Sequence, residues 1–77
     1  MENKTVIGFI GAGNMAYALI KGLLSNGFDA QNINVSDSND ELLIKRKSEL
    51  NIATYSDNTS LLNNSDIVVF AVKPQVL

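Results

Sequence analysis

The chain has 77 residues, of which 45% are hydrophobic and 18% charged, with a formal net charge of −2 and a pI near 4.7. This length allows at most one small domain, and the acidic balance argues against nucleic acid as the main partner. The sequence has no Cys and no His, which excludes thiol nucleophiles, disulfides, zinc sites of the usual kind and imidazole acid–base chemistry within these residues.

Residues 5–16, TVIGFIGAGNMA, predict a strand, a glycine turn and a helix. The apolar run 6–10 ends at the turn, and the helix is expected over residues 14–26. A G-x-G-x-x-A pattern falls on Gly11, Gly13 and Ala16. Gly11 suits the tight turn, Gly13 admits a pyrophosphate close to the backbone, and Ala16 lets the helix lie near the strand. Because a strand precedes the turn and a helix follows it, we expect a dinucleotide site rather than a merely structural turn.

The first helix is expected to have one apolar face, because its hydrophobic residues recur at helical spacing. These residues are Met15, Ala16, Leu19, Ile20, Leu23 and Leu24. Gly22 weakens the helix, and we explain it by close packing on the sheet. Gly27 is the expected left-handed stop.

A short second strand, residues 33–36, ends at Asp37. Ser38 and Glu41 form an S-x-x-E capping box that predicts the start of a second helix. Its expected apolar side comprises Leu42, Leu43, Ile44 and Leu50, and Asn51 is its expected stop. The basic run 45–47 is interpreted as a solvated helix face with a Glu41–Lys45 pair, in preference to a phosphate patch.

A weak third strand is expected over residues 52–55, a brief helix from Ser56 through Leu62, and a fourth strand over 67–72. Pro74 is placed to begin another helix. Strands one and four are apolar throughout and are expected at the centre of a parallel sheet, with strands two and three toward an edge. Right-handed crossovers then favour an α/β, Rossmann-type sheet with strand order 3-2-1-4, truncated after the fourth strand. The ligand crevice should lie where strands one and four end.

We see no repeat or linker, so residues 1–77 are expected to form one partial dinucleotide-binding domain. The first residues carry no hydrophobic signal region, and the apolar runs are too short to span a bilayer. We therefore expect a soluble, cytoplasmic protein that contacts no membrane and contains no metal site.

The sequence resembles the amino-terminal part of pyrroline-5-carboxylate reductase. The resemblance rests on IGFIGAGNMAYALIKGLL at residues 7–24, on Ser65-Asp66, and on AVKPQ at residues 71–75. It spans essentially the whole chain and only the first part of a family member. It implies an NAD(P)H-dependent oxidoreductase that reduces the imine 1-pyrroline-5-carboxylate to L-proline, the last step of proline biosynthesis.

The resemblance also implies which residues contact the cofactor. Residues 10–15 would hold the pyrophosphate, Asp37 the adenosine ribose, Asn58 the adenosine portion, and residues 71–74 the side toward the nicotinamide ribose. The full set is Ile10, Gly11, Ala12, Gly13, Asn14, Met15, Asp37, Asn58, Ala71, Val72, Lys73 and Pro74. The family's imine-binding groups lie mostly in a carboxy-terminal helical dimerisation domain, which forms a homo-oligomer and is absent here. No catalytic residue is assigned, and this segment alone is expected to be inactive.

Other interpretations stay open for several of these residues. Lys73-Pro74 could simply end a strand and begin a helix, Asn58 could only start a helix, and Met15 could be core packing. The chain could also belong to a hydroxyacid dehydrogenase or related reductase, or to a non-enzymatic dinucleotide-binding module. Asp37 favours NADH, since an acidic residue here commonly binds a ribose 2′-OH. The family commonly uses NADPH, so we expect both cofactors to be accepted.

Overall fold

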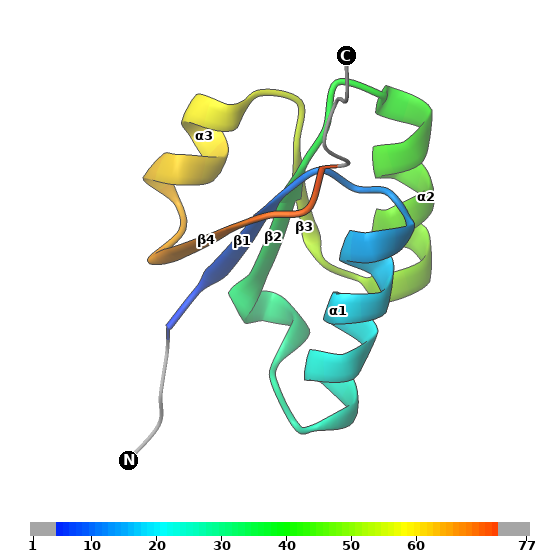
Figure 1. Ribbon diagram of the computed structural model, residues 1–77, viewed down its shortest axis with the longest axis vertical. Coiled ribbons are helices and arrows are strands. Elements are labelled where there is room, and N and C mark those ends of the chain that lie inside the picture. The colour runs from blue at the N-terminus through cyan, green and yellow to red at the C-terminus, as the bar shows by residue number, and fades with distance from the viewer. Residues whose placement is uncertain (1–4, 73–77) are drawn as a thin grey trace.

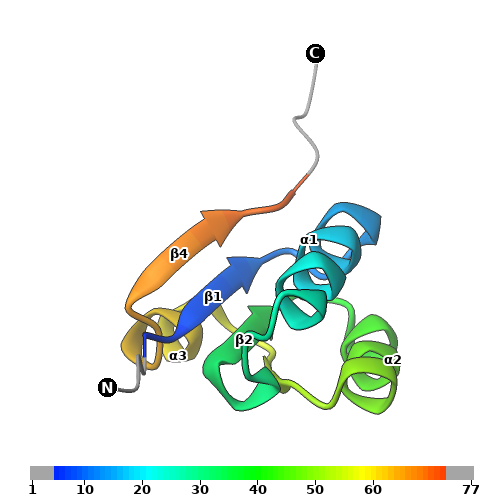
Figure 2. The same cartoon turned by 90° about the horizontal axis from the view of Figure 1, so that it is seen from below.

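A computed structural model describes residues 5–72 of the chain. Its elements are β1 (Ile7–Ile10), α1 (Asn14–Ser25), the 3-10 helix η1 (Ala30–Asn32), β2 (Ile33–Ser36), α2 (Asp40–Leu50), β3 (Ala53–Tyr55), α3 (Asn58–Asn63) and β4 (Ile67–Phe70). The four strands form one parallel sheet in the order β3-β2-β1-β4, which confirms the predicted fold class and strand order. Helices α1 and α2 lie on one face of the sheet and α3 on the other (Figures 1 and 2). The expected helix at Pro74 lies outside the described residues.

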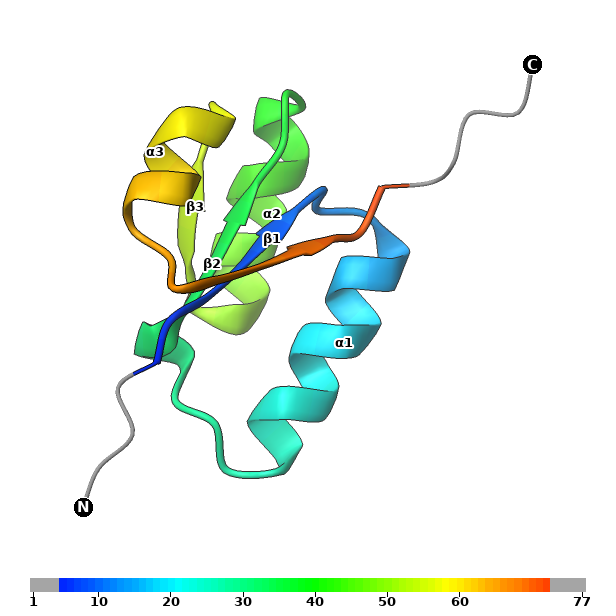
Figure 3. The ribbon, with the colours of Figure 1, turned by 60° about the vertical axis from the view of Figure 1, so that its left-hand side comes forward.

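Strand β1 is central and pairs on both sides, since Ile7 lies opposite Ile33 in β2 and Ile67 in β4. The ladder continues past the strand ends, where Gly11 N–H donates to Ser36 O and Ala71 N–H to Ile10 O, both at 2.8 Å. Parallel pairing gathers the carboxyl ends of the strands at one edge of the sheet. Figure 3 shows the ends of β1 and β4 beside the start of α1, the position expected for the ligand crevice.

The main core lies between the sheet and the pair α1 and α2. Its buried members are Phe9, Ala12, Ala16, Ile20, Ile33, Val35, Leu43, Leu50, Ile52 and Ala71. Phe9 and Ile20 are among the largest fully buried side chains, and each such side chain contributes about 1.5–3 kcal/mol when removed from water. This core fixes the glycine turn, because Ala12 within the turn and Ala16 in the helix after it are both buried.

Strand burial differs from the expectation. Every residue of β2 is buried, although Asn34 and Ser36 are polar. Asn34 Nδ2 donates to Asn64 O at 2.8 Å, and Ser36 Oγ donates to Asn58 Oδ1 at 2.7 Å. These bonds offset the cost of burying the two polar side chains. The polar residues of β2 therefore do not indicate an exposed strand at the edge of the sheet. In β4 the apolar Ile67 and Phe70 are 50% and 71% exposed, because β4 is the outer strand of the described sheet.

The stops of two helices were predicted correctly, but the start of α2 was not. Gly27 and Asn51 both have positive φ, of 91° and 58°. Helix α2 begins at Asp40, and its cap is Asn39, whose Oδ1 accepts from Leu42 N–H at 3.1 Å. The predicted Ser38–Glu41 capping box is therefore wrong. The pattern placed the cap one residue too early, because Asn is as good a capping residue as Ser.

Helix α1 buries a narrower stripe than expected. Ala16 and Ile20 are buried, whereas Met15 and Leu19 are 49% and 44% exposed. Gly22 does not serve close packing, since a Cβ built there meets no atom within 4 Å. On α2, Leu43 and Leu50 are buried as expected, but Ile44 is 70% exposed.

A glycine whose packing role the sequence did not suggest is Gly8 in β1. A Cβ there would run into the side chain of Ser65 and lie 3.2 Å from Leu61 Cγ. Glycine therefore lets α3 and the segment after it lie close on the sheet. None of the helices within residues 5–72 combines the length and apolarity needed to cross a bilayer.

Candidate functional site

Two adjoining hollows of about 340 and 320 Å³ form a cleft at the carboxyl edge of the sheet. The first is lined by Ile10, Gly11, Ser36, Asp37, Ser38, Ser56, Asp57, Asn58 and Val72. The second is lined by Gly11, Gly13, Asn14, Met15, Asp37, Ala71 and Val72. Gly11, Asp37 and Val72 line both. The cleft thus runs from the start of α3, past the end of β2, to the start of α1.

Gly11 shapes the turn between β1 and α1. Its φ is +107°, a conformation that residues with a Cβ rarely adopt. A Cβ there would also lie 2.8 Å from Val72 Cγ1 and 2.9 Å from Ala71 O. The turn therefore needs glycine both for its backbone conformation and for the close approach of the chain that leaves β4.

Gly13 is the N-cap residue of α1, and a Cβ built on it would meet nothing within 4 Å. No side chain caps this helix, whereas Asn39 caps α2 and Asp57 caps α3. The first bond of the helix runs from Tyr17 N–H to Gly13 O at 3.0 Å. The N–H groups of residues 14–16, the first turn of α1, have no acceptor within the helix. Together with the positive end of the helix dipole, they are suited to bind an anion in the cleft.

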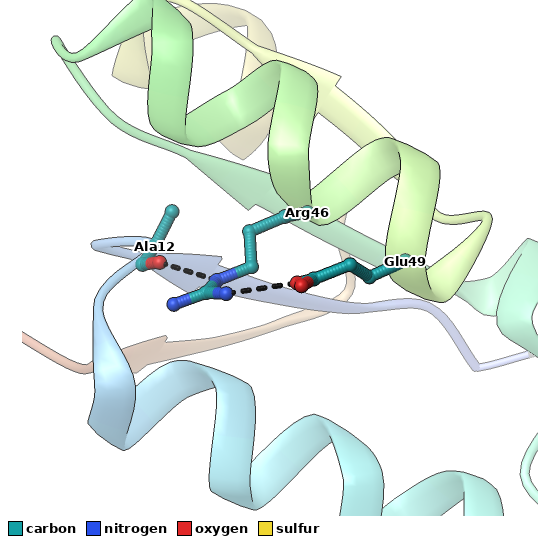
Figure 4. Close-up of polar contacts among 3 residues, drawn as sticks. All are labelled: Ala12, Arg46 and Glu49. Atoms are coloured by element: carbon teal, nitrogen blue, oxygen red, sulfur yellow. Dashed lines mark hydrogen bonds and ion pairs between the residues drawn. The ribbon is translucent and has the colours of Figure 1, made fainter.

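The peptide groups of Ala12 are held by two charged side chains. Asp37 Oδ2 accepts from Ala12 N–H at 2.8 Å, and Arg46 Nε donates to Ala12 O at 2.8 Å (Figure 4). Ala12 itself is fully buried and lines neither hollow. Its part in the site is therefore to carry backbone groups whose directions Asp37 and Arg46 determine.

Arg46 contradicts the interpretation of residues 45–47 as a solvated face. Lys45 and Lys47 are exposed, but Arg46 is only 5% exposed. Its Nη1 pairs with Glu49 Oε1 at 3.0 Å (Figure 4). Within residues 5–72 this pair takes the place of the expected Glu41–Lys45 pair. Helical spacing cannot distinguish a charged side chain that snorkels into a core from one that faces water.

At the far end of the cleft, Asn58 is the first residue of α3 and accepts a hydrogen bond from buried Ser36. Ser56 and Asp57 line the same hollow and were not among the predicted site residues. They follow β3 directly, so the rule that ligands bind beyond strand carboxyl ends could have indicated them. The Asp57 carboxylate is occupied in capping α3, where its Oδ2 accepts from Ser60 N–H at 2.8 Å.

The structure brings most of the predicted residues together. Ile10, Gly11, Gly13, Asn14, Met15, Asp37, Asn58, Ala71 and Val72 line the cleft, and Ala12 lies behind it. Lys73 and Pro74 lie outside the described residues. Half-exposed Met15 borders the cleft, which argues against the core interpretation. No group of three or more His, Cys, Asp or Glu side chains within residues 5–72 is arranged to hold a metal ion.

Comparisons with known proteins agree with this geometry. The family described as NADP oxidoreductase coenzyme F420-dependent matches residues 6–77. The chain is 42% identical over 77 residues to a pyrroline-5-carboxylate reductase of Vibrio alginolyticus, covering all of this chain and 28% of that protein. A solved pyrroline-5-carboxylate reductase of Coxiella burnetii superposes with a TM-score of 0.86 at 40% identity, over 94% of this chain and 27% of that one.

A more distant solved structure shares the fold alone. It is the WlbA dehydrogenase of Chromobacterium violaceum, determined with NADH, with a TM-score of 0.71 at 15% identity over 94% of this chain and 22% of that one. The resemblance to pyrroline-5-carboxylate reductases is thus confirmed, and the chain spans 28% of the length of its curated relative from Vibrio. The match over residues 6–77 shows that this chain belongs to the NADP oxidoreductase coenzyme F420-dependent family.

Proposed function

We propose that the protein carrying this chain is an NAD(P)H-dependent pyrroline-5-carboxylate reductase, in which these residues bind the cofactor. The observation that carries the proposal is the uncapped start of α1, where Gly13 opens onto the cleft that Asp37 and Val72 also line. The identity of 42% to a reductase of that name supports the choice of reaction. When bound, the reduced nicotinamide supplies the hydride for the imine carbon.

The residues of this chain bind and orient the cofactor. The N–H groups at the start of α1 face the pyrophosphate, and Gly13 leaves room for it. The hollow between Asp37 and Asn58 takes the adenosine side, and Ala71 and Val72 border the path toward the nicotinamide ribose. The imine-binding and proton-donating groups belong to a carboxy-terminal helical domain, through which the protein forms a homo-oligomer. Residues 1–77 alone are therefore expected to reduce no imine.

We further propose that both nucleotides are accepted and that NADH is used well for this family. Asp37 lines both hollows of the cleft, at the end of β2. A carboxylate there repels a 2′-phosphate by up to ~4 kcal/mol per pair of charges 4 Å apart at an effective dielectric of 20. Ser38 lines the same hollow and offers its hydroxyl group to a phosphate, whereas the Ser36 hydroxyl is buried and donates to Asn58.

The test compares substrates and nucleotides on the protein that carries this chain. Nicotinamide oxidation is followed with 1-pyrroline-5-carboxylate and with a 2-oxo acid, each with NADH and with NADPH, and L-proline is identified as the product. Imine-dependent oxidation that yields L-proline supports the proposal. Oxidation with only the 2-oxo acid would instead indicate a hydroxyacid dehydrogenase. Nucleotide binding without oxidation of either would indicate a non-enzymatic module.

A further inference from the structure

We propose that Arg46 is a positioning residue for the dinucleotide pyrophosphate, acting through the backbone of Ala12. The inference rests on the proposed function, and it adds a residue of α2 to a site otherwise built from loops at the strand ends. Arg46 touches no ligand in this assignment. It fixes the direction of a peptide group in the glycine turn.

The guanidinium of Arg46 is held in one place by three neighbours. Its Nε donates to Ala12 O at 2.8 Å, its Nη1 pairs with Glu49 at 3.0 Å, and its Cζ lies 4.6 Å from the centroid of the Tyr17 ring. Stacking on an aromatic ring and bonding through a planar fork use the geometry of arginine, which lysine lacks. Ala12 belongs to the turn and Tyr17 to α1, so Arg46 ties α2 to both.

Fixing the Ala12 carbonyl also fixes the N–H group of Gly13. The two belong to one planar peptide, and every peptide in residues 5–72 is trans, so they point in opposite directions. With the carbonyl turned in toward buried Arg46, the Gly13 N–H points away from it, on the side where Gly13 lines the cleft. Asp37 fixes the preceding peptide through Ala12 N–H. The glycine turn therefore holds the N–H group of Gly13 in a fixed direction toward the cleft.

The ion pair with Glu49 alone does not explain a buried arginine at this position, because the Glu49 side chain is 36% exposed. A pair with one partly exposed partner contributes little stability, while burying the guanidinium still costs desolvation. Arg46 is 5% exposed on a helix whose neighbouring cations, Lys45 and Lys47, both reach solvent. Its placement meets a specific need of the turn: a donor for a buried carbonyl within the core cluster that contains Ala12.

The experiment measures dissociation constants for NADPH and for ADP-ribose by calorimetry, in the protein that carries this chain. The variants are Arg46→Met and Arg46→Lys, with Lys45→Met and Lys47→Met as controls that remove an exposed cation from the same helix. Circular dichroism confirms folding at the assay temperature. We expect Arg46→Met to weaken both ligands at least tenfold, Arg46→Lys to weaken them at least threefold but less than Met, and the controls to stay within twofold.

Unchanged affinity in a folded Arg46→Met protein would overturn the inference and leave the proposed function intact. If Arg46→Met does not fold, Arg46→Lys decides, and wild-type affinity in that variant would overturn the inference. Equal losses in Arg46→Met and the controls would show a general charge effect and also overturn it. A wild-type protein that binds neither ligand would refute the proposed function itself, and this inference with it.

Discussion

Asp37 lies directly against the glycine turn, because its Oδ2 accepts a hydrogen bond of 2.8 Å from the N–H of Ala12. Its Oδ1 accepts a second bond, of 2.9 Å, from the N–H of Asn39 at the start of α2. The carboxylate proposed to select the nucleotide therefore also joins the two segments that border the cleft. A substitution of Asp37 should therefore change both the cofactor preference and the free energy of unfolding. Comparing two variants that differ in their hydrogen-bonding atoms separates the two effects.

Asp37→Ser should raise the NADPH/NADH ratio of kcat/KM at least about tenfold, equivalent to ~1.4 kcal/mol. The physical reason is the loss of repulsion between a carboxylate and the 2′-phosphate. Asp37→Asn is the matched control, since it removes the charge and keeps an oxygen that can accept from Ala12 N–H. Both variants should shift the ratio, and the serine variant should lose more unfolding free energy, by ~1 kcal/mol. A ratio that stays constant in both would remove Asp37 from cofactor selection.

Gly13→Val should abolish nucleotide binding and leave the fold largely intact. Its side chain would extend into space that is open in the structure, so nothing in the protein is displaced, and the pyrophosphate loses its room. Titration by nicotinamide fluorescence measures the affinity, and circular dichroism checks folding. Unchanged affinity in a folded variant would refute the role assigned to Gly13.

Gly11→Ala, in the same glycine motif, should reduce stability, in contrast to Gly13→Val, which should reduce binding. The added methyl group requires a residue with a Cβ at φ +107° and presses on Ala71 O. We expect a loss of at least ~1 kcal/mol of unfolding free energy from backbone strain alone, measured by denaturant titration. Together the two variants test whether one glycine serves the turn and the other the ligand. A Gly11→Ala protein as stable as wild type would contradict this division.

Gly22→Ala should stabilise the protein by up to ~1 kcal/mol without changing nucleotide affinity. Alanine is the better helix former, and the structure leaves open space for its methyl group. Thermal unfolding followed by circular dichroism measures the gain. A loss of stability would mean that the close packing first expected of Gly22 exists after all.

Gly8→Ala should destabilise the protein, because its methyl group would collide with Ser65 and crowd Leu61. Overpacking of this kind typically costs about 1–3 kcal/mol. A second change, Ser65→Gly, removes the colliding side chain and should recover part of the loss. The double-mutant cycle is read from denaturant midpoints. Additive losses would show that the two residues do not compete for the same space.

Local sequence patterns predicted the sheet but not the polar contacts beneath it. Strand order followed from apolar runs such as residues 67–72 and from the handedness of crossovers. Arg46 was misinterpreted because its partners Ala12 and Tyr17 lie in a distant part of the chain, beyond any helical window. The burial of Asn34 could not be predicted either, because its side-chain amide donates to Asn64 O, in the segment that follows α3.

The placement of the cleft residues was predictable for a different reason. In a parallel sheet the carboxyl ends of all strands share one edge, so residues such as Asp37 and Val72 meet there once the strand order is known. The cap of α2 was missed by one residue, because Ser38 and Asn39 are chemically near-equivalent caps and only backbone geometry chooses between them.

The central position of β1 sets an order of events during synthesis. Its two neighbours pair with it through Ile33 in β2 and Ile67 in β4, so β1, the first of the four described strands, gains its second partner only when the fourth has been made. Until Asp66 emerges and its N–H donates to Val6 O, one edge of β1 has no partner in the sheet. Such distant pairings pay chain-closure entropy before they gain contacts, which slows folding and leaves an apolar strand edge open to other nascent chains.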